Sequence, residues 1–298
     1  MKFGTYIMGM RLRDTPQIAQ AYEANGFESL WISEHLVFPA EMPPTYPYSD
    51  SGLPPVTSDT PSYDPWAVLS YLACATSTIR LATNVYILPL RHPLQTARSV
   101  ITAERLSGGR ITLGIGVGWL EDEFDYVDMP FKTRGKRTDA TIEVLRQLWS
   151  DDIIEVHNEH FNFGPVKFQP KPIQKPSIPI EVGGTSRAAL ERAGRLGDGW
   201  IEIGSESLED FEAKLAIVLE ARREAGREGP FEVTASSGSW RHEGIKSDLD
   251  DYRRLRDAGA TRLIVAPSHP LDRHPETQDW IDWSSRFADE VIAVLGDE

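Results

Sequence analysis

A carboxyl group and an imidazole stand side by side at Glu34 and His35, directly after an apolar run that ends at Ile32. An imidazole changes its charge near neutral pH, so a histidine at the end of a buried strand can give or take a proton during a reaction. The alternative is that both side chains hold the following loop in place by hydrogen bonds. The spacing of the two residues does not decide between these roles.

Three further residues, Thr83, Asn84 and Val85, lie near the end of another apolar segment. Asparagine is disfavoured inside a β-branched strand, so its presence there needs a reason. One reason is a bulge at which the backbone can press against a flat ring. The other is a polar side chain that is hydrogen-bonded inside the mouth of a barrel.

Gly116 and Gly118 mark the end of a third apolar segment. They do not form a dinucleotide fingerprint, because no βαβ unit with a later ribose-binding acid follows them. Glycines at a strand end still permit a ligand to approach the backbone closely. We therefore keep both as candidate ligand-binding positions.

A run of small residues, Gly183, Gly184, Thr185 and Ser186, follows a fourth apolar segment and opens a predicted helix. Backbone N–H groups at a helix start can face an anionic group with no side chain in the way. In a parallel α/β sheet, ligands bind at the carboxyl ends of the strands. The run therefore predicts a site for a phosphate-bearing ligand, and hence an enzyme.

The composition narrows the class of protein. A net charge of −14 argues against a nucleic-acid partner, which needs a basic face. The single cysteine, Cys74, allows no intrachain disulfide and indicates a reduced, cytoplasmic setting; its apolar surroundings predict a buried structural thiol. We expect no signal peptide and no membrane span, since no apolar run approaches about 20 residues.

Short β-branched or aromatic runs alternate with amphipathic stretches along the whole chain. The predicted strands are Lys2–Met8, Glu28–Ile32, Ile79–Leu88, Arg110–Ile115, Ile178–Val182, Gly199–Ile203, Phe231–Ala235 and Thr261–Ala266. The predicted helices are Thr15–Asn25, Pro65–Thr76, Pro93–Ser107, Thr133–Ser150, Ser186–Leu196, Ser207–Glu224, Ile245–Ala258 and Asp279–Leu295. This order predicts an α/β fold, a (β/α)₈ TIM barrel, with residues 1–298 as one domain.

Two segments interrupt the alternation. Residues 39–65 hold eight prolines and several tyrosines, which favours an active-site lid over a disordered strip. Residues 153–177 predict a short hairpin and a proline-rich connection. The hairpin contains His157 and His160, but without a third ligand in view we expect no metal site there. The acids 121–123 are expected to cap a helix or face solvent.

Several long motifs follow one another along the chain: GFESLWISEH, TSTIRLATNVYILPLRHP, ERLSGGRITLGIGVGW, RGKRTDATIEVLRQLW and IPIEVGGTS. In this order they closely resemble the bacterial luciferase-like superfamily, and in particular its deazaflavin (coenzyme F420)-dependent oxidoreductases. The similarity runs from about Met1 to Trp200. It implies a luciferase-like (β/α)₈ barrel with the ring of the cofactor at the carboxyl-terminal mouth.

The resemblance also implies roles for particular residues. A non-proline cis peptide is expected at Asn84-Val85, and the cofactor phosphate is expected on the backbone of residues 183–186. The acid–histidine pair at Glu34 and His35 matches the position of the family's active-site histidine. Val117 departs from the pattern, because related enzymes have there a glutamate or a phosphate-holding arginine. This departure weakens a flavin assignment and leaves residues 183–186 as the main phosphate site.

The leading hypothesis is an F420-dependent oxidoreductase that transfers a hydride between the deazaflavin C5 and a small organic substrate. The alternative is a monooxygenase dependent on reduced FMN, and the third is a non-catalytic flavin- or deazaflavin-binding protein. The superfamily pairs through helices near the second and third strands, and the apolar helix 65–76 is compatible with a homodimer. The sequence does not identify the substrate.

Overall fold

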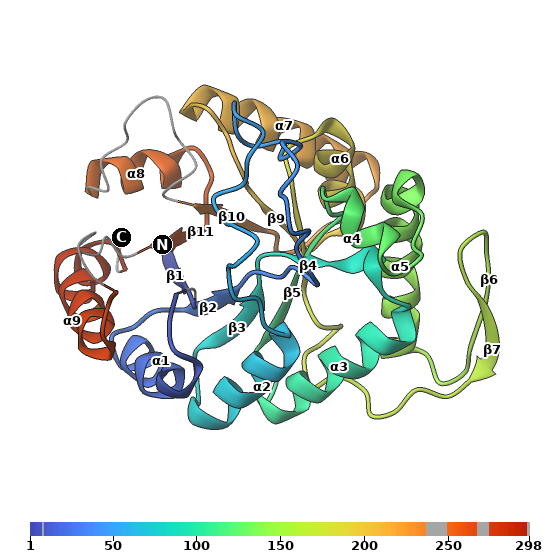
Figure 1. Cartoon of the computed structure of the whole chain (residues 1–298), viewed down its shortest axis with the longest axis horizontal. Coiled ribbons are helices and arrows are strands. Elements are labelled where there is room, and N and C mark those ends of the chain that lie inside the picture. The colour runs from blue at the N-terminus through green and yellow to red at the C-terminus, as the bar shows by residue number, and fades with distance from the viewer. Residues whose placement is uncertain (8, 237–248, 267–273, 297–298) are drawn as a thin grey trace.

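A parallel sheet closed into a barrel organises the chain (Figure 1). The computed structural model describes residues 1–7, 9–236, 249–266 and 274–296. The strands pair in the order β3-β2-β1-β11-β10-β9-β8-β5-β4, and β3 also pairs with β5, which closes the sheet. Their bounds are β1 Lys2–Tyr6, β2 Ser29–Ile32, β3 Arg80–Thr83, β4 Tyr86–Ile87, β5 Ile111–Gly116, β8 Ile180–Gly183, β9 Gly199–Ile201, β10 Glu232–Ser236 and β11 Arg262–Val265.

Helices surround this barrel, as predicted for a (β/α)₈ fold (Figure 1). Their bounds are α1 Thr15–Ala24, α2 Pro65–Ala75, α3 Pro93–Leu106, α4 Glu121–Asp125, α5 Arg134–Ser150, α6 Arg187–Leu196, α7 Leu208–Glu224, α8 Leu249–Asp257, α9 Thr277–Phe287 and α10 Ala293–Leu295. The first turns of α2 and α3 contain Pro65 and Pro93, where a missing N–H leaves no hydrogen bond unmade.

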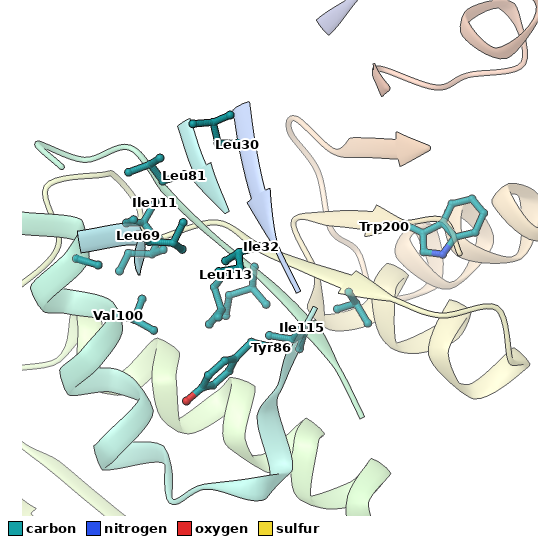
Figure 2. Close-up of a cluster of buried hydrophobic side chains, with 14 of the residues drawn as sticks. Leu30, Ile32, Leu69, Leu81, Tyr86, Val100, Ile111, Leu113, Ile115 and Trp200 are labelled. Atoms are coloured by element: carbon teal, nitrogen blue, oxygen red, sulfur yellow. The ribbon is translucent and has the colours of Figure 1, made fainter. Parts of the chain in front are cut away.

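Two apolar layers hold the barrel and its helices together. The outer layer lies between the strands and the helices; Leu81, Leu69 and Val100 belong to it (Figure 2). A smaller cluster fills the barrel interior and consists of Trp31, Ala82, Ile201 and Ile264. Tyr6, Val85 and Ile203 lie over that interior cluster and are only partly buried. The interior is therefore a packed core whose upper layer faces the mouth.

The two insertions are present where the sequence places them. One joins β2 to α2. The other contains an antiparallel hairpin of β6 (Ile154–His157) and β7 (Asn162–Val166) and lies before β8. The predicted strand 79–88 is divided in two, because β3 ends at Thr83 and β4 resumes at Tyr86.

The sequence-based expectation for the single cysteine is wrong. Cys74 is exposed rather than buried. Helix α2 buries Leu69, Leu72 and Ala73 against the barrel, and Cys74 follows on the outer face with Tyr71. The apolar composition of the helix hid this outer face. In the described part of the chain, no helix is long and apolar enough to span a membrane.

Candidate active site at the barrel mouth

The carboxyl ends of β1, β2, β3, β5, β8 and β9 meet around the partly buried side chains of Tyr6, Val85 and Ile203. Parallel pairing brings these strand ends to one rim, so residues far apart in the sequence share one site. The candidate residues at positions 34–35, 83–85, 116–118 and 183–186 all follow or end these strands.

His35 is held by a buried carboxylate. Its Nδ1 lies 2.9 Å from Oε2 of Glu123, whose side chain is fully buried. The other carboxylate oxygen, Oε1, accepts the backbone N–H of Leu36 at 2.7 Å and lies 3.4 Å from that of Val37. One acid thus fixes both the imidazole and the chain that leaves β2.

Glu123 was not identified from the sequence. It stands in a run of three acids, and the run was expected to cap a helix or face solvent. Its neighbours Glu121 and Asp122 are accessible, whereas Glu123 points inward from α4. The only sequence signal was its position shortly after the glycines that end β5.

Glu34 makes its observed contacts away from the imidazole. Its Oε1 accepts Arg91 Nη2 at 2.5 Å, and its Oε2 accepts the backbone N–H of Ile87 at 2.8 Å. Burial raises the pKa of the Glu34 carboxyl, and the Arg91 guanidinium acts in the opposite direction. These contacts attach the end of β2 to β4 and the loop before α3. A catalytic role for Glu34 stays a prediction.

The peptide bond Asn84-Val85 is cis, as the family resemblance implies. The Asn84 backbone oxygen accepts the Ser33 hydroxyl at 2.7 Å, and Asn84 Nδ2 donates to the Tyr6 hydroxyl at 2.7 Å. The Asn84 side chain is thus hydrogen-bonded inside the mouth, as one alternative held, and the backbone there is irregular. Contact of this backbone with a flat ring stays a prediction. Thr83, just below, donates its hydroxyl to Gly114 O at 2.7 Å.

The side chain of Val85 is the reason why two of the candidate positions are glycine. A Cβ atom at Gly116 would lie 2.5 Å from Val85 Cγ2, and one at Gly183 would lie 2.7 Å from Val85 Cγ1. Both glycines therefore make room for the valine, which remains partly accessible at the mouth. Gly118 has a φ of +81° and packs against Phe124 and Ile87. Direct cofactor contact by Gly116 and Gly118 stays a prediction.

The turn after β8 is firmly held. Buried Trp200 donates its indole N–H to Gly184 O at 3.0 Å, and Gly184 N donates to Ile201 O at 3.3 Å. Gly184 has a φ of +123°, a conformation that L side chains rarely adopt. Ser186 caps α6 by accepting the Ala189 N–H at 3.3 Å. The backbone of this turn, at the start of a ten-residue helix, suits an anionic group.

The segment 39–65 is a folded loop that reaches this turn. It leaves β2 and extends toward α6 and α7 (blue in Figure 1). At its base, Ser62 donates its hydroxyl to His35 O at 2.6 Å. At its far end the Tyr48 ring packs on Gly204, and the Tyr48 hydroxyl oxygen would lie 3.6 Å from a Cβ atom built at Gly184. Burial raises the pKa of this hydroxyl, and hydrogen bonding by Thr185 acts in the opposite direction.

Aromatic rings connect this far end to His35. The ring centroids of Tyr48 and Tyr46 are 5.4 Å apart, those of Tyr46 and Trp119 are 5.1 Å apart, and those of Trp119 and His35 are 5.8 Å apart. Edge-to-face pairs at such distances are favourable. One wall of the mouth therefore runs from the imidazole to the turn 183–186.

Two polar side chains complete the site on the side of β1 and β9. Burial raises the pKa of Tyr6 to about 12, while hydrogen bonds to Ser236 and Asn84 act in the opposite direction. Glu202, which follows β9, is 1% exposed and accepts the Ser205 N–H at 2.5 Å. Tyr6 and Glu202 were not identified from the sequence, since single residues next to strand ends carry no spacing signal.

Four of the other six histidines have separate surroundings. His157 lies on the exposed hairpin and contacts Glu155 and Asn162, and the described residues contain no cluster of three His, Cys, Asp or Glu side chains suited to a metal ion. His92 caps α3 by accepting the Leu94 N–H at 3.2 Å. His242 and His269 lie outside the described residues, as do all the other residues of 237–248 and 267–273.

Comparison with known proteins gives a consistent result. A family model described as luciferase-like monooxygenase matches residues 1–288. An uncharacterised protein of Mycobacterium tuberculosis is 33% identical over 281 residues, covering 93% of this chain and 94% of that protein. The F420-dependent hydroxymycolic acid dehydrogenase of the same species is 30% identical over 215 residues, 71% of this chain and 54% of that protein. The solved structure of the monooxygenase RslO1 from Streptomyces bottropensis superposes on this chain with a TM-score of 0.76. The superposition covers 99% of each chain at 19% sequence identity, which shows a shared fold.

Proposed function

The chain belongs to the luciferase-like monooxygenase family, and from this premise we propose that it is an oxidoreductase that uses coenzyme F420 to reduce or oxidise a small organic substrate at the barrel mouth. The observation that carries the proposal is His35, fixed by the buried Glu123 at a rim that also holds Val85 and the turn 183–186. A positioned proton donor, an apolar platform and an anion-binding turn are the parts that such a reaction needs.

The residues present fit a phosphate-bearing ring cofactor. The Tyr48 hydroxyl oxygen lies over this turn, 3.6 Å from a Cβ atom built at Gly184, so a polar oxygen fits there. The partly accessible Val85, Tyr6 and Ile203 would lie under a flat ring. When bound, the deazaflavin would supply or take up a hydride. The protein would orient it, exclude water beneath the segment 39–65 and handle the accompanying proton.

His35 would exchange that proton at Nε2, because Glu123 engages Nδ1. Glu123 would hold the ring in one orientation and stabilise the imidazolium that forms on protonation. F420 is favoured over FMN because a relative that is 30% identical is F420-dependent by name, whereas the likeness to the monooxygenase RslO1 is one of fold.

A binding experiment tests the proposal. The purified protein, freed of bound cofactor, is titrated by calorimetry with coenzyme F420 and, separately, with FMN. Selective binding of F420 supports the proposal. Selective binding of FMN would favour the reduced-FMN monooxygenase, and tight binding without turnover of any alcohol, carbonyl or alkane substrate would favour a carrier.

A further inference from the structure

The Tyr48 hydroxyl occupies the turn that the cofactor phosphate would need. A Cβ atom built at Gly184 would lie 3.6 Å from the Tyr48 hydroxyl oxygen, so Tyr48 covers the backbone of this turn. Burial raises the pKa of this hydroxyl, and hydrogen bonding by the side chain and backbone of Thr185 acts in the opposite direction. A phosphate oxygen bound on the turn and the Tyr48 oxygen would therefore need the same place.

The aromatic ring of Tyr48 is also held in place by packing. A Cβ atom at Gly204, whose φ is +79°, would lie 3.0 Å from Tyr48 Cδ1, so the ring packs directly on this glycine after β9. The loop itself is ordered: Tyr46 N donates to Gly52 O at 2.7 Å, and Gly52 N donates to Ser49 O at 2.9 Å. Tyr48 is therefore placed on the turn by a folded loop.

We propose that Tyr48 is an internal competitor for the phosphate site: its hydroxyl closes the turn 183–186, and an anionic cofactor binds by displacing it. This inference rests on the proposed function for the identity of the ligand, but the contact itself is a property of the chain. Displacement also changes the surroundings of His35, because Tyr48 packs on Tyr46, which packs on Trp119, whose ring contacts His35. Cofactor binding and the setting of the active-site histidine are thereby linked.

The first test needs no cofactor. In Tyr48→Phe the ring stays and the hydroxyl is lost, so amide hydrogen exchange of the peptide that contains Thr185 should become about two- to tenfold faster, as expected for losing one hydrogen bond. Tyr63→Phe removes a hydroxyl from an exposed tyrosine of the same segment and serves as the matched control. Unchanged exchange in Tyr48→Phe would overturn the inference.

The second test measures affinity by calorimetry with F420, FMN and inorganic phosphate. If the hydroxyl competes, Tyr48→Phe binds the cofactor about two- to tenfold more tightly than the unsubstituted protein, and Tyr63→Phe does not. Weaker binding would show that Tyr48 is a ligand of the phosphate, and equal binding that it does not compete; either result overturns the inference. If no cofactor binds to any of the three proteins, the proposed function fails, whereas hydrogen exchange and the phosphate titration still decide the role of Tyr48.

Discussion

At the scale of single residues, His35 carries the central prediction. His35→Ala should leave cofactor affinity within about tenfold and lower kcat by roughly 10²–10⁴, the usual contribution of a positioned acid or base. Steady-state kinetics and cofactor titration of the same preparation measure both quantities. If the His35 side chain is only an anchor for the chain that leaves β2, through its contact with Glu123, the variant would instead lose thermal stability while kcat stays near normal.

Glu123 is a positioning residue, and its substitution should differ from that of His35. Glu123→Gln keeps the size of the side chain and removes its charge, so the imidazolium loses a partner while the loop keeps an acceptor. We expect kcat to fall about 10- to 100-fold with little change in KM. A purely structural glutamate would instead lower thermal stability and leave the kcat of the folded variant unchanged. Glu121→Gln, in the same short helix but accessible, is the control.

The difference between Glu34 and Glu123 shows what sequence reasoning could not supply. The adjacent pair Glu34 and His35 was visible in the sequence, whereas the carboxylate that reaches the imidazole lies 88 residues away along the chain. Successive residues leaving a strand point to different sides, so sequence neighbours need not meet. Which of three consecutive acids turns inward depends on how α4 packs under the mouth, and no spacing rule encodes that.

At the scale of elements, the predicted strands and helices agree with the described residues to within a few positions, apart from the divided strand 79–88, since each has strong periodicity and marked ends. The first four residues of the predicted helix Ile245–Ala258 lie outside the described residues. The short helix α4 was not predicted, because five residues are too few for an apolar period. Gly197 follows α6 directly, at a place where a left-handed glycine often ends a helix, but its φ is −82°. A Cβ there would lie 2.7 Å from Ala193 O, so the glycine is needed for close approach instead.

Glu23 links two elements and gives a pH-dependent prediction. Its Oε1 accepts hydrogen bonds from Ser77, Thr78 and Ile79, which attaches the end of α1 to the turn before β3. Burial acts to raise the pKa of Glu23, but these hydrogen bonds outweigh it and the pKa is lowered. The stabilisation is therefore present above the unfolded pKa of about 4.3 and lost as the pH falls through the lower folded pKa.

Glu23→Gln should thus lower the free energy of unfolding by about 1–2 kcal/mol at pH 7, since hydrogen bonds to a charged acceptor are lost. The difference from the unsubstituted protein should shrink as the pH falls from about 5 to below 4. Urea unfolding at a series of pH values measures it. Glu212→Gln, at an exposed position on α7, is the control; a pH-independent effect of Glu23→Gln would contradict the ionic explanation.

At the scale of the whole molecule, a buried ion cluster joins strands at the end of the barrel opposite the mouth. Arg262 donates to Glu181 at 2.8 Å, to Glu28 at 2.9 Å and to Glu232 at 3.2 Å, and so connects β11 with β8, with the start of β2 and with β10. Burial raises the pKa of Glu181, and Arg262 opposes that rise. Closure of the barrel therefore depends on one cation and three acids from distant parts of the chain.

Arg262→Met should lower the free energy of unfolding by about 3–5 kcal/mol, because it leaves a buried carboxylate without its partner. Adding Glu181→Met should restore part of the loss, since an apolar pair of similar volume is tolerated better than one unpaired acid. Urea unfolding compares the single and double variants. Cofactor affinity should stay unchanged in both, and a comparable loss of affinity would show that the two ends of the barrel are coupled.

The homodimer expected from the sequence remains a prediction, and the structure offers one surface as its expected interface. On the outer face of α2, Tyr71 is 50% exposed and Cys74 is also exposed, and α3 lies alongside (Figure 1). An apolar face of this kind pairs with a second copy by excluding water, so a charge at its centre should prevent association. We expect a dimer at micromolar concentration that Tyr71→Asp converts into a folded monomer, measured by sedimentation velocity. Leu219→Asp, at a 46% exposed position on α7, should leave the dimer intact. A monomeric unsubstituted protein, or equal dissociation by both substitutions, would rule out α2 as the interface.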